Sequence, residues 1–426
     1  MTEELTTRAG AVQVRPEPPE PSIYSLGDPA VNANPYTLYR HLLDHQPVTE
    51  SSYGTVLVKY EDCAAVLRDS RFSSDDRNAI QQRELASSPP PEPGQRAVLD
   101  QRSFLRLDPP DHTRLRRLAT KAFTPSAVEA LRAVVQQMVD EAIDGAAPEQ
   151  RTELIADLAY PLPITVISRL LGIPPEDHLA MQSWSRATLC CSFETSTDHS
   201  NQIQCDLAAY FDRLIAERRR RPGDDLLSAL IAAEERGDQL TTEEINATCR
   251  LLLVAGHETT VSLIGNGMLA LLRNPDQLRL LRENPPLAPG AVEEVLRYDA
   301  PFQFTQRVAL EDVEVRGVPI RRGQPVFVFL AAANRDPDRF EDPDRFDITR
   351  PDNRHLGLGT GIHACLGGPL ARLQGQIALY TLAARLVDPV LEIDPPPYRR
   401  TGDFHALEAL PVAFRGVRPT VTATMG

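Results

Sequence analysis

The chain has 426 residues, and its 45 basic and 59 acidic side chains give it a formal net charge of −14. This acidic balance argues against nucleic acid as the main partner. The sequence shows neither an apolar run of membrane-span length nor an N-terminal signal-peptide pattern, so we expect a cytoplasmic protein with no part in a membrane.

The first residues, 1–22, are rich in Glu, Pro and Thr and poor in large apolar groups, which predicts a disordered tail. Residues 23–426 contain no clear break in composition, and we expect them to form one domain. The start of this domain combines short regular elements with a long polar loop, of the kind that often covers a binding site. The predicted elements are a helix over Tyr36–His45, a strand over Tyr53–Tyr60, a helix over Glu61–Arg68 and the loop over Ser73–Arg102.

A run of helices follows this loop. Asp111 can cap the first of them, which carries four cations and no acid between residues 112 and 121. A solvated helix face would account for such a run, and so would a face that binds an anion. Apolar periodicity predicts further helices over Ser126–Asp144, Leu154–Leu171, Pro175–Thr188, Ser200–Arg220 and Leu226–Arg236.

The longest predicted helix runs from the capping box Thr241–Glu244 to about residue 273. Its centre, Leu251–Ala255, is apolar nearly all round, so the helix should cross the protein interior. The next stretch, Gly256–Thr260, places a glycine, a carboxylate and two threonines in that interior, against helix propensity. Such a local conflict is typical of a functional site. A glutamate that faces solvent and a threonine that packs in the core would also account for it.

Glu294 and Arg297 stand three residues apart in a predicted helix over Gly290–Tyr298, where they can pair on one face. Exposed pairs at this spacing are common and weak, so the pair alone indicates little. Val313–Val318 and Val326–Leu330 alternate in the manner of short strands. The chain as a whole is therefore predicted to be mainly α-helical with a small β region.

A glycine-rich loop over His355–Arg372 ends in Cys365 and then turns helical. Gly359 and Gly361 allow backbone conformations and close approaches that a Cβ atom would block. The cysteine sits near a predicted helix N-terminus, where amide N–H groups and the helix dipole favour a thiolate. A thiolate held against a flat ligand suits an axial haem ligand. A buried structural cysteine on a turn is the alternative reading.

Three motifs together resemble those of the cytochromes P-450, the haem-thiolate monooxygenases. They are the loop Gly359-x-Gly361-x-His363-x-Cys365-x-Gly367, the stretch Ala255-Gly256-His257-Glu258-Thr259, and Glu294-x-x-Arg297. The resemblance extends from about Tyr36 to Phe414. One departure is Leu358, because the family usually has phenylalanine seven residues before the cysteine.

The resemblance implies the cytochrome P-450 fold in a single domain, with haem b between the long helix and the cysteine loop. Cys365 would be the axial thiolate ligand of the iron, and Glu258 and Thr259 would deliver protons during oxygen activation. The implied propionate ligands are His112, Arg116, Arg307 and His363, and the other residues expected at the haem are Ala255, Leu358 and Gly359. The expected substrate pocket is lined by Leu251, Val254, Phe302, Phe304 and Leu407. Arg345 is expected to join Glu294 and Arg297 in bracing the haem loop.

The reaction implied is the insertion of one oxygen atom from dioxygen into a small or mid-sized organic substrate. Resemblance to actinobacterial biosynthetic members suggests natural-product scaffolds, either free or bound to a carrier protein. Because the sequence contains no flavin or iron–sulfur motif, electrons from NAD(P)H are expected through a ferredoxin and its reductase. Arg114, Arg117 and Lys121 would face outward as the docking patch for that partner.

Three alternatives remain open on the sequence. Phenol coupling, desaturation or peroxide-driven oxidation could take place on the same haem. A haemless protein of this fold that recruits a partner would not need Cys365, Glu258 and Thr259 together. A hydrolase using Cys365 with His363 lacks an orienting acid and an oxyanion hole in the sequence.

Overall fold

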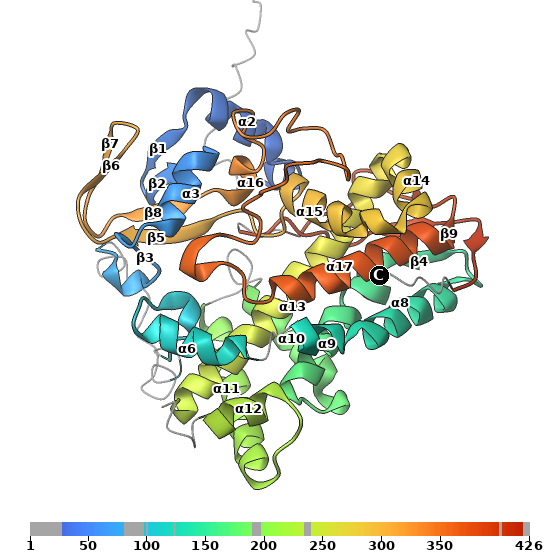
Figure 1. Ribbon diagram of the computed structural model, residues 1–426, viewed down its shortest axis with the longest axis horizontal. Helices are drawn as coiled ribbons and strands as arrows, with labels where there is room; N and C mark the ends of the chain where they lie inside the picture. The colour runs from blue at the N-terminus through green and yellow to red at the C-terminus, as the bar shows by residue number, and fades with distance from the viewer. Residues whose placement is uncertain are drawn as a thin grey trace, which may run out of the picture.

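The computed structural model describes residues 28–80, 98, 101–121, 125–189, 197–233, 240–399 and 403–420. The predicted tail, residues 1–22, and most of the predicted loop over Ser73–Arg102 lie outside the described residues. Within the described part the chain is mainly helical, as predicted, and its short strands lie on two opposite sides of the molecule (Figure 1). No helix among the described residues is both long enough and apolar enough to cross a bilayer.

The helices account for most of the described chain. In chain order they are α1 (Pro29–Ala33), α2 (Tyr36–His45), α3 (Tyr60–Arg68), α6 (Asp111–Thr120), α7 (Pro125–Glu129), α8 (Arg132–Ala146), α9 (Pro161–Leu171), α10 (His178–Leu189), α11 (Thr197–Arg220), α12 (Leu226–Ala233), α13 (Thr242–Arg273), α14 (Pro275–Glu283), α15 (Ala288–Tyr298), α16 (Leu330–Ala333) and α17 (Gly368–Arg385).

The strands are short. They are β1 (Val48–Ser51), β2 (Gly54–Leu57), β3 (Phe72–Ser73), β4 (Arg151–Glu153), β5 (Thr305–Ala309), β6 (Val313–Val315), β7 (Val318–Ile320), β8 (Pro325–Val328), β9 (Leu386–Val387), β10 (Val390–Leu391), β11 (Pro411–Ala413) and β12 (Gly416–Val417). Five of them form a sheet in the order β1-β2-β8-β5-β3, in which β2 and β8 are parallel and the other pairs antiparallel.

Two predicted helices are interrupted in the structure. The stretch Leu154–Leu171 begins as a single wide turn over Ile155–Ala159, and a regular helix restarts only at Pro161. Proline has no N–H to donate and its fixed φ suits the first position of a helix, which explains the new start. The predicted helix Ser126–Asp144 divides into α7 and α8, and the predicted strand Val313–Val318 is the hairpin of β6 and β7.

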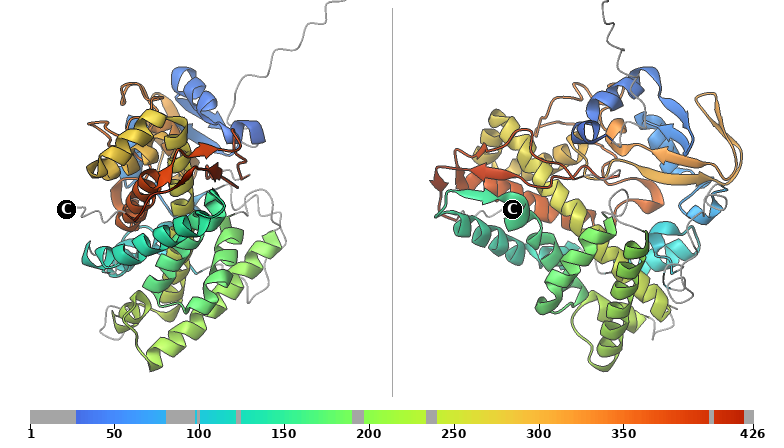
Figure 2. Two further views of the ribbon diagram at one scale, coloured as in Figure 1. Left: turned by 90° about the vertical axis from the view of Figure 1, so that its right-hand side faces the viewer. Right: turned by 180° about the vertical axis from the view of Figure 1, so that it is seen from behind.

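Helix α13 organises the interior, as the sequence predicted. Thr241 Oγ1 accepts a hydrogen bond from the Glu244 N–H at 3.2 Å, and Glu244 Oε2 accepts one from the Thr241 N–H at 2.9 Å. This capping box fixes the start of α13, which then packs against α9, α10, α11 and α17. Figures 1 and 2 show α13 running between the sheet end of the molecule and the end formed by α10 to α12.

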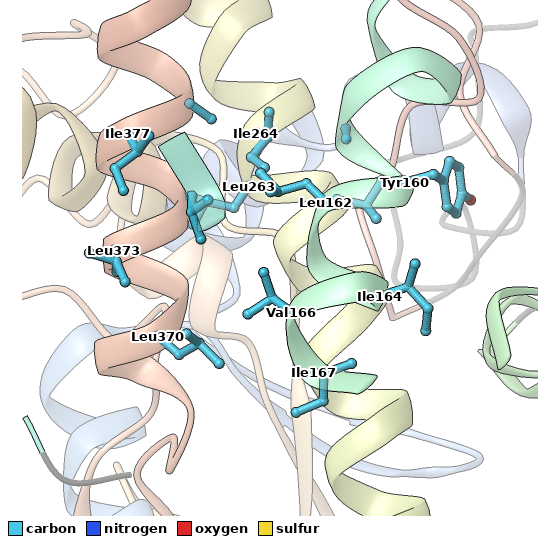
Figure 3. Close-up of a cluster of buried hydrophobic side chains, with 14 of the residues drawn as sticks. Tyr160, Leu162, Ile164, Val166, Ile167, Leu263, Ile264, Leu370, Leu373 and Ile377 are labelled. Carbon is cyan, nitrogen blue, oxygen red and sulfur yellow. The ribbon is translucent and has the colours of Figure 1, made fainter. Parts of the chain in front are cut away.

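The largest hydrophobic cluster joins α13 to α9 and α17. Figure 3 shows Leu263 and Ile264 of α13 between side chains of α9, such as Leu162, and side chains of α17, such as Leu373. Each buried Leu or Ile of this kind contributes roughly 1.5–3 kcal/mol relative to the exposed side chain. Because α17 begins directly after the cysteine loop, this packing fixes the C-terminal end of the loop.

Candidate active site

The cysteine loop has the strained turns that the glycine pattern predicted. Gly359 and Gly361 have φ angles of 67° and 74°, in the left-handed region that favours glycine. A Cβ atom on Gly361 would lie 2.4 Å from the carbonyl oxygen of Leu67 in α3, which is too close for any other residue. The Cys365 N–H donates to the Leu358 carbonyl at 2.8 Å, and α17 starts three residues later at Gly368. The loop is therefore clamped between α3 and α17.

Cys365 has solvent-accessible surface, although protein surrounds its thiol on most sides. This is expected for a group in the wall of a binding site. Burial raises the pKa of this thiol, while the N–H groups of Gly367 and Gly368 and the positive charges of Arg116 and Arg372 act in the opposite direction. Hydrogen bonds and positive charges of this kind stabilise a thiolate once a metal replaces its proton.

Four basic side chains from three parts of the chain converge beside the loop. The ring centroids of His112 and His363 are 4.3 Å apart. Arg116 donates to the carbonyl of Ala364, next to the cysteine. Arg307 is 7% exposed and donates only to the Thr305 hydroxyl and the Gln306 carbonyl among the described residues. The sequence predicted these four residues, and the structure brings them together.

Among the described residues, no acidic side chain forms a hydrogen bond or an ion pair with this basic cluster. Burial lowers the pKa of Arg307 to about 10, and burial together with the charges of Arg307, His112 and Arg116 lowers that of His363 to about 3. Both ring nitrogens of His363 are buried without a hydrogen-bond partner among the described residues. Buried polar groups are normally paired. The cluster therefore fits a bound anion, and the two carboxylates of a haem are such a group.

One face of α13 is accessible in the middle of an otherwise buried helix. Leu251, Val254, Ala255 and Thr259 have accessible surface, whereas the residues between them are mostly buried. Spacings of three and four residues place these side chains on one face of the helix. The Thr259 hydroxyl donates to the Ala255 carbonyl at 2.8 Å, so it has the backbone partner that a hydroxyl in an apolar helix needs.

Glu258 points into a different environment from its neighbour Thr259. Its carboxylate is buried, and its Oε2 forms an ion pair with Arg399 at 2.5 Å. The Tyr160 hydroxyl lies 3.4 Å from the same oxygen and accepts a hydrogen bond from Arg399 at 2.7 Å. Glu258 Oε1 has no hydrogen-bond partner among the described residues. No local sequence pattern predicts Arg399 or Tyr160 as partners of Glu258.

The predicted third member of the Glu294–Arg297 pair is wrong. Glu294 binds Arg297 at 2.7 and 2.9 Å, as predicted, and both side chains are fully buried. The second arginine on Glu294 is Arg350, at 3.2 Å, whereas Arg345 is 63% exposed and lies 3.5 Å from Asp347. Arg345 contributes only its backbone carbonyl, because its side chain points outward from the turn at Asp342.

A second acid on α15, Glu293, holds the cysteine loop, and the sequence analysis did not predict this role. Glu293 accepts hydrogen bonds from Arg372 at 2.7 and 2.9 Å and from His355 Nε2 at 3.2 Å. Burial would raise the pKa of this carboxyl, but the bonds from Arg372 and His355 outweigh it and lower the pKa to about 2. The cysteine loop runs from His355 to Arg372, so Glu293 connects α15 to both ends of this loop.

The predicted pocket residues outside α13 divide into two groups. Phe302 packs against Phe404, with ring centroids 5.1 Å apart, at a short pairing between two irregular segments. Phe304 stacks on Phe329 in the hydrophobic cluster around α2, and Leu407 is buried against Gly265. The structure therefore gives no support for Phe304 and Leu407 as pocket residues, because both side chains are used in core packing.

The predicted docking patch also needs correction. Arg114 does not face outward freely, since it forms an ion pair with Glu244 at the start of α13. Arg117 and Lys121 on the same segment are exposed. The patch predicted from the sequence is therefore reduced to these two side chains.

Known proteins of similar sequence and structure point to the same family as the three sequence motifs. The family model described as Cytochrome P450 matches residues 188–386. The chain is 42% identical to the cytochrome P450 monooxygenase PikC of Streptomyces venezuelae, over 93% of this chain and 95% of that protein. It is 41% identical to the biotin biosynthesis cytochrome P450 of Bacillus subtilis (strain 168), over 89% and 96%. The crystal structure of P450BioI with a hexadec-9Z-enoic acid-ligated acyl carrier protein superposes with a TM-score of 0.84, covering 91% of this chain and 99% of that one at 41% identity.

Proposed function

Because the chain belongs to the cytochrome P450 family and is a monooxygenase of that family, we propose that it hydroxylates or epoxidises a small or mid-sized organic substrate in natural-product biosynthesis. The observation that carries the proposal is the position of Cys365 beside four basic side chains that contact no acidic side chain in the part of the chain that the structure describes. A haem would satisfy both features at once, because its iron takes the thiolate and its propionates take the basic groups.

When bound, haem b would supply the iron at which dioxygen is reduced. Cys365 would hold the iron, and the Gly367 and Gly368 N–H groups would hold the thiolate. His112, Arg116, Arg307 and His363 would neutralise the propionates. The accessible face of α13, with Leu251, Val254 and Ala255, would form the apolar wall over the reacting substrate.

Thr259 and Glu258 would move protons. The Thr259 hydroxyl lies on the accessible face of α13, where it can hold a water molecule or a reacting oxygen by a hydrogen bond. The Glu258 carboxylate can accept a proton at Oε1, the oxygen that has no partner among the described residues, and pass it on by turning toward Thr259. An acid next to an alcohol supports dioxygen activation over a peroxide-driven route.

We propose that electrons come from NAD(P)H through a ferredoxin and its reductase, as the sequence resemblance implies. The exposed cations Arg117 and Lys121 lie on the segment of α6, whose Arg116 contacts the cysteine loop. An acidic partner docked on this face would lie close to the iron, and its charge would complement these side chains.

The relatives support a substrate from a biosynthetic pathway, and one of them supports a substrate that is bound to a carrier protein. PikC and the biotin biosynthesis enzyme carry biosynthetic roles or monooxygenase activity in their names, and P450BioI has been crystallised with an acyl carrier protein. We propose the same class of substrate for this chain.

The test is a screen of candidate metabolites, free and carrier-bound, for a type I spectral shift of the haem-loaded protein. Hits are then turned over with ferredoxin, reductase, NADPH and ¹⁸O₂. We expect one ¹⁸O atom in the product. A product that forms without ¹⁸O would contradict the proposed hydroxylation or epoxidation and favour desaturation or coupling on the same haem. The Cys365→Ser variant, run in parallel, should give no product.

A further inference from the structure

Arg250 of α13 is a buried cation whose contacts are all with uncharged groups. It is 8% exposed, and it forms no ion pair with any of the described residues. Its Nε donates to Asn246 Oδ1 at 2.9 Å, and its two terminal nitrogens donate to Gln204 Oε1 at 3.3 Å and Gln101 Oε1 at 3.0 Å. All three acceptors are neutral amides, although a buried charge is normally stabilised by an opposite charge.

One acid of α11 acts on Arg250 without touching it. Asp212 Oδ1 accepts a hydrogen bond from Asn246 Nδ2 at 2.7 Å, so an amide separates the carboxylate from the guanidinium. Burial lowers the pKa of Arg250, and it outweighs the opposing effects of Asp212 and Cys205. The charges of the protein therefore do not offset the burial of this guanidinium.

The other buried arginines show how this chain stabilises such a charge. Among the described residues six arginines are buried, and four of them form an ion pair with an Asp or Glu: Arg297, Arg335, Arg385 and Arg399. Arg307 forms no such pair and belongs to the basic cluster that fits the carboxylates of a haem. Arg250 is the sixth. By the same chemistry, it fits a carboxylate on a second bound molecule.

Arg250 lies at one end of the accessible face of α13. It directly precedes Leu251 and stands one turn before Val254, and both of these residues have accessible surface. Gln101 comes from the segment before α6 and Gln204 from α11, so the guanidinium lies where these two segments meet α13. A ligand that lies along the accessible face would reach the guanidinium with one end.

The guanidinium has N–H groups left for such a ligand. An arginine carries five N–H donors, and the contacts with Asn246, Gln204 and Gln101 use one hydrogen on each nitrogen. One hydrogen on each terminal nitrogen therefore has no partner in the part of the chain that the structure describes. Two such N–H groups suit the bidentate binding of a carboxylate. Both glutamine side chains belong to partly exposed residues and can move aside as the ligand enters.

We propose that Arg250 is a specificity-determining residue that binds the carboxylate of a substrate lying along the accessible face of α13. The proposal deepens the proposed function and rests on it. Between the free and the carrier-bound substrates considered above it selects the free acid, because a thioester has no negative charge to offer Arg250.

The spacing along α13 indicates how far the carboxylate lies from the carbon that is oxidised. Thr259, at the other end of the accessible face, is nine positions after Arg250, which is about 13 Å along a helix that rises about 1.5 Å per residue. A fully extended chain advances about 3.5 Å for every three bonds, so the oxidised carbon should lie about eleven bonds from the carboxylate.

The experiment compares the binding of lauric acid and lauramide to the haem-loaded protein at neutral pH, by calorimetry and by the type I spectral shift. Lauric acid has the length that the helix spacing indicates, and lauramide has the same length without the charge. The wild type should bind the acid about tenfold more tightly than the amide. Arg250→Gln should lower the affinity for the acid about 10- to 100-fold, the loss expected for hydrogen bonds to a charged group, and leave the affinity for the amide unchanged.

Two further variants and a product analysis complete the test. Arg250→Lys keeps the charge but loses the planar fork, so it should retain part of the preference for the acid, and it replaces Arg250→Gln if that variant does not fold. Arg213→Gln removes an exposed cation from α11 and should leave both affinities unchanged. With ferredoxin, reductase and NADPH, the wild type should oxidise lauric acid near its methyl end, and Arg250→Gln should spread the oxidation over more carbons.

A wild type that binds the acid no more tightly than the amide would overturn the proposal. So would an Arg250 variant that weakens the binding of both ligands equally, because Arg250 would then only connect α13 to its neighbours. These binding measurements do not depend on turnover. A protein that incorporates no ¹⁸O into any product would therefore count against the proposed function, and a missing preference for the acid would count against Arg250 alone.

Discussion

Arg350 and Arg345 lie five residues apart in one irregular segment, yet the structure gives them opposite importance. We predict that Arg350→Gln destabilises the protein far more than Arg345→Gln. The Arg350 side chain is 10% exposed and binds the fully buried Glu294 at 3.2 Å. It also donates to the carbonyls of Glu341 at 2.7 Å and of Asp342 at 3.3 Å.

The magnitude follows from what each substitution leaves behind. Removing one partner of a buried ion pair typically costs 3–5 kcal/mol, but Glu294 keeps Arg297, so we expect about 3 kcal/mol for Arg350→Gln. Arg345 is 63% exposed and its contact with Asp347 is 3.5 Å long, so its loss should cost about 0–1 kcal/mol.

The assay is urea unfolding followed by circular dichroism, with both variants compared with the wild type at equal m-value. Haem retention provides a second readout. Arg297 also donates to the carbonyl of Asn334, whose side chain accepts from the Leu356 N–H at the start of the cysteine loop. Arg350→Gln should thus lose haem faster than Arg345→Gln. Equal stability losses in the two variants, or a larger loss in Arg345→Gln, would refute the reasoning.

Three further predictions concern the reaction. Thr259→Ala should fold within about 1 kcal/mol of the wild type and accept electrons, yet release peroxide in place of product; full coupling of NADPH consumption to product would remove Thr259 from proton delivery. Leu358→Phe should keep haem and shift its reduction potential, because residue 358 accepts the Cys365 N–H and a ring there would shield the thiolate; an unchanged potential would mean that the side chain points elsewhere. Charge reversal of Arg117 and Lys121 should slow ferredoxin-driven reduction at low salt, and the effect should disappear as salt rises because charges are screened over about 10 Å at 0.1 M. An unchanged reduction rate at low salt would place the docking site on another face.

Features with a strong local signal were predictable from the sequence. The capping box at Thr241, the glycine turns at Gly359 and Gly361, and the apolar centre of α13 each follow from a few neighbouring residues. His363 and the three basic side chains around it could be named from the resemblance, and the structure brings them together.

Features that depend on long-range folding of irregular chain were not predictable. Arg345 and Arg350 lie in a segment without periodicity, so nothing in the sequence decides which one turns inward. Arg399 meets Glu258 across 141 residues of chain, and no local pattern records such a contact. In the sequence, Phe304 and Leu407 cannot be distinguished from apolar residues that line a pocket. Only their neighbours in the folded protein show that both side chains pack in the core.

The coordination of haem iron by Cys365 is the central claim, and the optical spectrum of the reduced protein with carbon monoxide tests it most directly. We expect the wild type to show the red-shifted Soret band of a thiolate-ligated ferrous complex. Cys205→Ser, which changes a partly exposed thiol on α11, should keep this band, and Cys365→Ser should lose it. A wild-type protein that stays colourless after haem supplementation, or a Cys365→Ser variant that keeps the band, would contradict the account.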